Sequence, residues 1–180
     1  MNAIVPSSAA RQEPPRQETA QYLTFALGDE IYAIGILSIK EIIEFGGITH
    51  VPMMPPAIRG VINLRGAVVP VMDLAQRFGR PSSPVTKKTC IVIVEQESEG
   101  EQHVIGVVVD SVHAVQDIAG TDIEPAPSFG LRIAPDFVAG MGKVDGRFVI
   151  VLAMGAVLSV VDLAALGSSA DPAQRLIAAG

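Results

Sequence analysis

The segment that most constrains the fold reads Gly-Val-Ile-Asn-Leu-Arg-Gly-Ala-Val-Val-Pro-Val-Met-Asp-Leu, from Gly60 to Leu74. Two β-branched runs flank the tetrapeptide Asn-Leu-Arg-Gly, whose asparagine and glycine favour a tight reversal between strands. The pattern therefore predicts a β-hairpin with Arg65 at its tip. Beyond the hairpin, Pro70 restricts the second run to a sheet edge or a strand end, and Asp73 is placed to cap a short helix over 74–78.

The same pattern returns 80 residues later in the chain. The segment Gly140–Leu152 aligns without gaps on Gly60–Met72, with a glycine at the start, a glycine after the turn and apolar residues beyond it. Upstream, Val104–Val112 aligns on Ile31–Ile39 with an offset of 73. Two such similar offsets predict one β unit that is present twice, and the alternative is chance similarity between valine-rich strands.

The number of strands predicts the architecture. About five short strands lie on each side of the proline-rich segment Arg80–Pro84, without the spacing that crossover helices need, so we expect a mostly all-β fold of two small β-barrels in tandem. The first barrel would span about 19–80 and the second about 85–153, followed by a short apolar helix over about 154–166. Residues 1–18 are expected to be a disordered N-terminal tail and residues 167–180 a C-terminal tail.

Composition and charge exclude several classes of function. The formal net charge of -6 and the absence of tryptophan give no basic face and few stacking platforms for nucleic acid. No signal peptide is evident, and Asp162 interrupts the apolar C-terminal stretch, so we expect an intracellular, cytoplasmic chain without membrane insertion. The single cysteine, Cys90, excludes an internal disulfide framework and lies in a predicted strand.

The residues do not form a recognisable reaction centre. The histidines His50, His103 and His113 have no metal-ligand spacing, and Asp110 and His113 would point to opposite faces of a strand. We therefore expect no metal, no cofactor and no enzymatic activity. The alternative from another class is a small metal-dependent hydrolase that uses Asp110, His103 and His113.

The positive signals are those of an interaction protein. Arg65 at a hairpin tip would be either a solvated charge or a forked donor that anchors a partner. Glu41, on a neighbouring apolar strand, is a candidate ion-pair partner for it.

Several segments of the chain resemble the CheW-like domain of bacterial chemotaxis coupling proteins. The resemblance covers about Thr19–Leu166, and the Asn-Leu-Arg-Gly hairpin is its most specific mark. The other matching segments are Phe25–Ile34, Lys40–Ile42, Ile58–Gly66, Val69–Val71, Asp73–Leu74, Gly106–Val112 and Ile123–Pro127.

The resemblance implies two five-stranded SH3-like barrels with a hydrophobic groove between them, and no enzymatic activity. Such proteins couple chemoreceptors to the histidine kinase CheA, are monomers in dilute solution and oligomerise in membrane-associated receptor arrays. A scaffold of a chemosensory pathway unrelated to motility is the alternative within the same fold.

The resemblance also implies two sets of binding residues. The positions that match the receptor-binding groove are Ile39, Glu41, Gly60, Arg65, Cys90, Gly106 and Val115, and those that match the docking surface for the kinase's own CheW-like regulatory domain are Ile36 and Val68.

Overall fold

The computed structural model describes residues 18–98, 100–127, 130–131 and 133–158. Its strands are β1 (Thr19–Leu27), β2 (Glu30–Gly35), β3 (Ile39–Glu44), β4 (Ile58–Leu64), β5 (Ala67–Asp73), β6 (Cys90–Ser98), β7 (Glu101–Val109), β8 (Ser111–Ala119), β9 (Ile123–Glu124), β10 (Val138–Val144) and β11 (Arg147–Leu152). Two one-turn helices, α1 (Leu74–Arg77) and α2 (Met154–Val157), and three 3₁₀ turns, η1 (Ile36–Ser38), η2 (Gly120–Asp122) and η3 (Pro135–Phe137), complete these elements.

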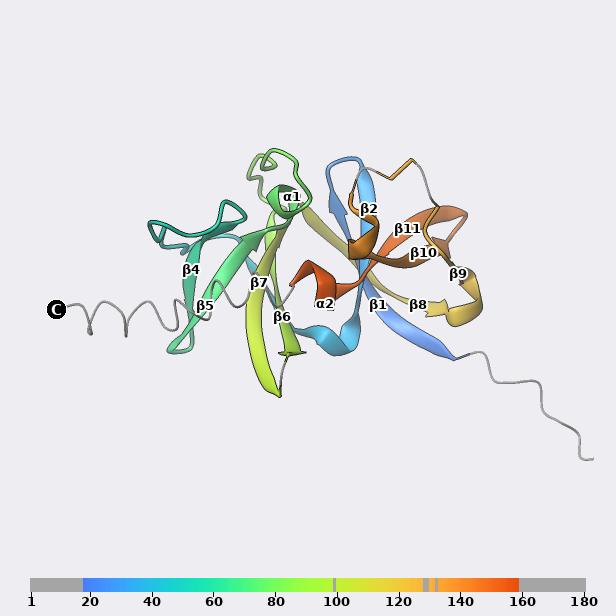
Figure 1. Ribbon diagram of the computed structural model, residues 1–180, viewed down its shortest axis with the longest axis horizontal. Coiled ribbons are helices and arrows are strands. Elements are labelled where there is room, and N and C mark those ends of the chain that lie inside the picture. The colour runs from blue at the N-terminus through green and yellow to red at the C-terminus, as the bar shows by residue number, and fades with distance from the viewer. Residues whose placement is uncertain (1–17, 99, 128–129, 132, 159–180) are drawn as a thin grey trace, which may run out of the picture.

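The strands form two sheets that lie side by side (Figure 1). One sheet has the order β8-β1-β2-β11-β10-β9, and the other has the order β3-β6-β7-β5-β4. The prediction of a mostly all-β fold with about five strands in each of two units is confirmed at this level. Closure of either sheet into a barrel stays a prediction.

The internal repeat predicted from the sequence is visible in the backbone. The hairpins β4–β5 and β10–β11 both turn at a non-glycine residue with positive φ, 53° at Arg65 and 50° at Asp145, followed by a glycine. Both have a register shift at their first glycine, Gly60 or Gly140, and both lead into a one-turn helix. The offset of 80 residues therefore relates two copies of one structural unit.

The two copies exchange strands, so the sheets do not follow the predicted division at residues 80–85. The N-terminal hairpin β1–β2 pairs with β8 and β11 from the second half of the chain. In the other sheet, β3, β4 and β5 from the first half flank β6 and β7. The assignment of residues 19–80 to one unit and 85–153 to another is thus corrected. One sheet combines the hairpin β1–β2 from the first half with four strands from the second, and the other combines the hairpin β6–β7 from the second half with three strands from the first.

Three clusters of buried apolar side chains hold the sheets together. The largest lies between the sheets and includes Phe25, Tyr32 and Ile34 from one sheet with Val92 and Val107 from the other. Two smaller clusters belong to one sheet each, one around Val71 and Ile93 and one around Ala33 and Val151. The alternation of the strands explains this arrangement, because successive side chains point to opposite faces and fill both cores.

Pro70 marks the point where two strands separate. The parallel pairing of β5 with β7 begins at Val71↔Gly106, whereas the equivalent pairing of β11 with β2 already includes Ile150↔Tyr32. Residue 150 corresponds to residue 70 in the repeat, and proline has no N–H to donate across a ladder. The prediction that Pro70 restricts pairing is therefore correct on the side that faces β7.

The polar junction between the sheets is built on Tyr32. Arg80 Nη2 donates to the Glu30 carboxylate at 2.8 Å and to the Tyr32 hydroxyl oxygen at 2.9 Å, and the Tyr32 hydroxyl donates to Glu30. Burial and the bond to Glu30 raise the pKa of the Tyr32 phenol well above its usual range. The phenol therefore stays protonated as a donor at neutral and moderately alkaline pH.

The C-terminal prediction is supported only over its first turn. Helix α2 covers Met154–Val157 and Leu158 is its C-cap, whereas residues 159–166 of the expected helix, like the tails over 1–17 and 167–180, lie outside the described residues. Arg77 of α1 donates to the Val157 carbonyl at 2.8 Å, so the two one-turn helices are linked directly. Among the residues that the structure describes, no helix has the length and apolar character needed to cross a membrane.

Candidate partner-binding surface

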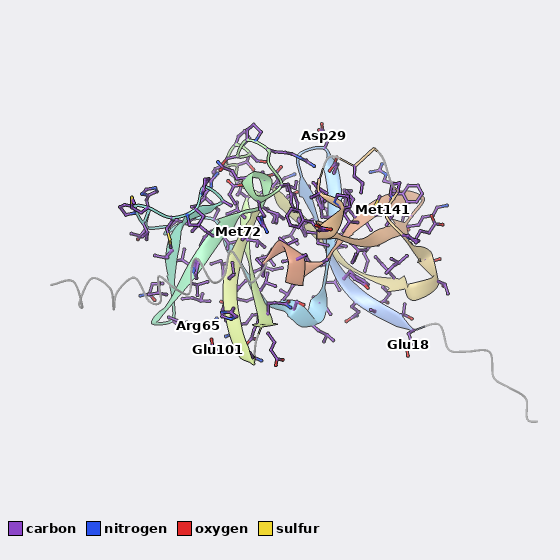
Figure 2. All side chains as sticks on the ribbon, viewed as in Figure 1. Glu18, Asp29, Arg65, Met72, Glu101 and Met141 are labelled. Carbon is purple, nitrogen blue, oxygen red and sulfur yellow. The ribbon has the colours of Figure 1, made fainter. Side chains whose placement is uncertain are left out.

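A hollow of about 560 Å³ opens where β5 and β7 separate. It is bounded by the tip of the β4–β5 hairpin, the first half of β7 and the start of β3, and Figure 2 labels Arg65 and Glu101 at the free ends of the two hairpins. The residues that line it are Lys40, Leu64, Arg65, Ala67, Val68, Val69, Pro70, Gln102, His103, Val104 and Ile105. We refer to this feature as the first hollow.

Arg65 and Glu41 form an ion pair at the rim of the first hollow. Arg65 Nη2 lies 2.6 Å from Glu41 Oε2, and the Arg65 side chain is 75% exposed whereas that of Glu41 is 21% exposed. The turn holds Arg65 forward because Asn63 Oδ1 accepts from the Gly66 N–H at 2.8 Å. The ion pair predicted from the sequence is confirmed.

The second carboxylate oxygen of Glu41 is left without a hydrogen bond. Glu41 Oε1 is buried and has no partner within the described part of the chain. A desolvated carboxylate oxygen without a donor costs stability, so the pair orients Arg65 more than it stabilises the fold.

Some of the predicted binding residues gather near this ion pair. Ile39 lies two residues before Glu41 on β3 and is half-buried against the core between the sheets. Ile36, in η1, packs against the same core. Val68 is 52% exposed and lines the first hollow. Three of the predicted positions, Ile36, Ile39 and Val68, therefore lie on η1, β3 and β5, the elements that surround the ion pair and the first hollow.

The predicted glycines are buried in close contacts. A Cβ on Gly60 would lie 2.1 Å from the carbonyl oxygen of Thr49, and one on Gly106 would lie 2.7 Å from Ile91 Cγ2. Both positions require glycine for packing, so the structure gives them a scaffold role. Direct contact with a partner at either position stays a prediction.

Cys90 and Val115 lie apart from the ion pair. Cys90 begins β6 opposite Glu44, whereas Ile39 faces Val94 in the middle of that strand. Its thiol donates to the Lys88 carbonyl at 3.2 Å, and burial together with the charge of Glu44 raises its pKa. Val115 lies on β8 in the other sheet and is 51% exposed.

The sequence analysis did not identify most of the residues that line the first hollow, and it did not predict a second, related hollow. A second hollow of about 380 Å³ is lined by Thr24, Ile31, His113, Gln116, Val144, Asp145, Arg147 and Val149. Under the repeat, Asp145 corresponds to Arg65, His113 to Lys40 and Val149 to Val69. The two offsets of 80 and 73, applied together, would have found this pair of related surfaces from the sequence.

The residues of the hydrolase alternative do not come together. His103 lines the first hollow and His113 the second. Asp110 Oδ2 instead accepts from the Gly28 N–H at 2.7 Å, which ties the β7–β8 turn to the β1–β2 turn. Within the described residues, no group of three or more His, Cys, Asp or Glu side chains is placed to hold a metal ion.

Comparison with known proteins places this geometry in a family. The model of the CheW-like domain matches residues 21–162, which is most of the chain. The chain belongs to the CheW-like domain family. Curated relatives of this CheW-like chain include the chemotaxis protein CheW of Klebsiella aerogenes, 33% identical over 144 residues (80% of this chain, 84% of the relative). The CheW of Helicobacter pylori is 34% identical over 152 residues (84% and 89%).

A solved structure agrees with the CheW-like fold. The scaffolding protein TtCheW from Thermoanaerobacter tengcongensis is similar with a TM-score of 0.70 and 33% sequence identity, over 83% of this chain and 92% of that one. The two-sheet arrangement with the Arg65 hairpin is thus that of a CheW-like domain, and the resemblance stated from the sequence is confirmed.

Proposed function

We propose that this chain is a non-enzymatic adaptor that couples chemoreceptors to the histidine kinase CheA. The observation that carries the proposal is the match to the CheW-like domain over residues 21–162, together with its similarity to chemotaxis proteins and to the solved structure of a scaffolding protein. The adaptor makes no bond; it would hold receptor and kinase together so that the state of one alters the geometry of the other.

The end of the sheet that carries Arg65 is the surface we assign to partners. Arg65 is an exposed, forked donor on a rigid two-residue turn, and such a group loses little freedom when it binds a carboxylate or a carbonyl. The neighbouring Val68 offers exposed apolar area. We assign the receptor to Arg65, Glu41 and Ile39, and the kinase to Val68 and Ile36.

A pull-down with a matched control tests this assignment. The purified protein is mixed with the host's CheA-type kinase and with a receptor cytoplasmic fragment, as wild type and as Arg65→Ala. Asp145→Ala is the control, because Asp145 occupies the same left-handed position at the tip of the second hairpin. Both substitutions therefore place alanine at the same turn position, and only Arg65→Ala removes the pair with Glu41.

The expected result separates the two partners. Wild type and Asp145→Ala should retain both receptor and kinase, whereas Arg65→Ala should retain the kinase and lose the receptor. If the wild type retains neither partner, the adaptor role is wrong. If Arg65→Ala and Asp145→Ala behave alike, the role can stand but the receptor is not bound at Arg65.

A further inference from the structure

The edges of β5 and β7 that face each other in the first hollow carry unpaired backbone groups. In an antiparallel hairpin with a two-residue turn, the residues that flank the turn hydrogen-bond to each other, and every second residue faces outward. Leu64↔Ala67 flank one turn and Ser98↔Glu101 flank the other. The groups that point into the space between the strands therefore belong to Val68 on β5 and to Gln102 and Val104 on β7.

Pro70 is the reason that one of these groups, the Val104 carbonyl, stays unpaired. A ladder pair between residues 70 and 105 would require the N–H of residue 70 to donate to the Val104 carbonyl, and proline lacks that hydrogen. In the second repeat the corresponding residue is Ile150, and its pairing with Tyr32 is formed. The second hollow is also the smaller of the two, about 380 Å³ against about 560 Å³.

We propose that the fork between β5 and β7, held open by Pro70, is a strand-addition site for an extended, acidic segment of a partner protein. An inserted strand would bond to Val68 on one side and to Gln102 and Val104 on the other, which is the chemistry of β-augmentation. The hollow falls within the roughly 300–1,000 Å³ of ordinary ligand pockets. The inference rests on the proposed function only in taking the ligand to be part of a protein.

The charges around the fork select an acidic segment. Among the described residues that line the first hollow, the charged side chains are Lys40 and Arg65, and the hollow has an apolar floor that includes Leu64 and Val69. In the second hollow, Asp145 takes the place of Arg65, and the described lining holds one acid, Asp145, and one arginine, Arg147. The two charges offset each other there, so an alternating segment of acidic and apolar side chains complements the first hollow better than the second.

Amide hydrogen exchange on the full chain, followed by NMR, tests the proposal. The probe is the hexapeptide Glu-Val-Glu-Val-Glu-Val at millimolar concentration, compared with Lys-Val-Lys-Val-Lys-Val. We expect slowed exchange at the amides of Val68, Gln102 and Val104 with the acidic peptide alone. Absence of protection at these amides, or equal protection by the basic peptide, would overturn the proposal.

Proline variants identify the backbone contact. Val68→Pro removes a donor that no ladder pair with β4 uses, so the hairpin is retained, and it should weaken peptide binding roughly five- to tenfold, the loss expected for one backbone hydrogen bond. Phe148→Pro makes the same change at the equivalent position of the second hairpin and should leave binding unchanged. Equal binding by wild type and Val68→Pro contradicts strand addition.

Pro70→Ile gives a second test that does not depend on an added proline. It copies the second repeat, restores the donor to the Val104 carbonyl and closes the fork by one residue, so peptide binding should fall while the protein remains folded. Binding that is unchanged in Pro70→Ile would overturn the proposal. The receptor pull-down reads out Arg65 separately, so failure of the strand site and failure of the adaptor role give different results.

Discussion

Gly60→Ala should destabilise the protein through one backbone contact. Gly60 has a φ of 153°, and a Cβ there would lie 2.1 Å from the carbonyl oxygen of Thr49 and 2.9 Å from Ile48 Cγ2. Backbone cannot yield as a flexible side chain can, so Thr49 must move away from β4. That movement breaks the reciprocal hydrogen bonds between Thr49 and Val61, which are 2.8 and 2.9 Å long.

The size of the effect follows from those two bonds. A net contribution of about 1 kcal/mol per backbone hydrogen bond predicts a loss of about 2 kcal/mol in the free energy of unfolding, in addition to the cost of placing alanine at this φ. Gly46 isolates that second cost, because its φ is 157° and nothing lies within 4 Å of a Cβ built on it. Gly46→Ala is therefore the matched control.

Urea unfolding followed by circular dichroism measures the difference. Gly60→Ala should unfold at lower urea than Gly46→Ala with an unchanged slope, and when folded it should still bind the receptor fragment. Free energies of unfolding that agree to within about 0.5 kcal/mol would refute the packing argument, since the bonds at stake are worth more. Loss of receptor binding by a fully folded Gly60→Ala would instead make Gly60 a contact residue.

Two other predictions come from single interactions, and a third comes from the family resemblance. Asp73 accepts from Arg59 Nε at 2.9 Å and from the Gln76 N–H at 3.2 Å. Asp73→Ala should therefore lower the free energy of unfolding, measured by urea titration, by about 2–4 kcal/mol. A loss below about 1 kcal/mol would contradict both the ion pair and the cap as stabilising contacts. Because the pKa of Tyr32 is raised, the folded state holds the phenol proton more tightly than the unfolded state does. The resulting contribution to the free energy of unfolding is complete below the ordinary phenol pKa and is lost as pH rises beyond it. The melting temperature of the wild type should therefore fall at alkaline pH, and that of Tyr32→Phe should fall less. An equal fall in both proteins would exclude Tyr32 as its source. Light scattering of the dilute protein should give a monomer, and a stable dimer would contradict the prediction made from the family resemblance.

The local structure could be predicted because its signals are local. The Asn-Leu-Arg-Gly turn and the cap at Asp73 both depend on residues within a few positions, and both are present in the structure. The exchange of strands between the repeats could not be predicted in this way. The pairing of β1 with β8 joins residues about 90 positions apart. Nothing in the sequence of β1 favours β8 as its partner over β3, the nearby strand of the same repeat.

The candidate site was predictable only in part for a related reason. The pairing of Arg65 with Glu41 followed from opposite charges on neighbouring strands. Gly60 and Gly106 entered through resemblance alone, and resemblance does not distinguish a residue that touches a partner from one that lets two backbones approach. Their Cβ clashes with Thr49 and Ile91 supply that distinction and favour the scaffold role.

The repeat itself indicates where function is concentrated. Two copies of one hairpin share their turn geometry, bulge and following helix, because these features are required to fold. They differ at the tip, Arg65 against Asp145, and at the fork, Pro70 against Ile150, and neither difference is required by the fold because both copies form. Residues that the scaffold leaves free to differ are those that binding can select. We therefore expect partners to bind the side of the molecule that carries Arg65 and Pro70, and to distinguish the first repeat from the second by these two residues.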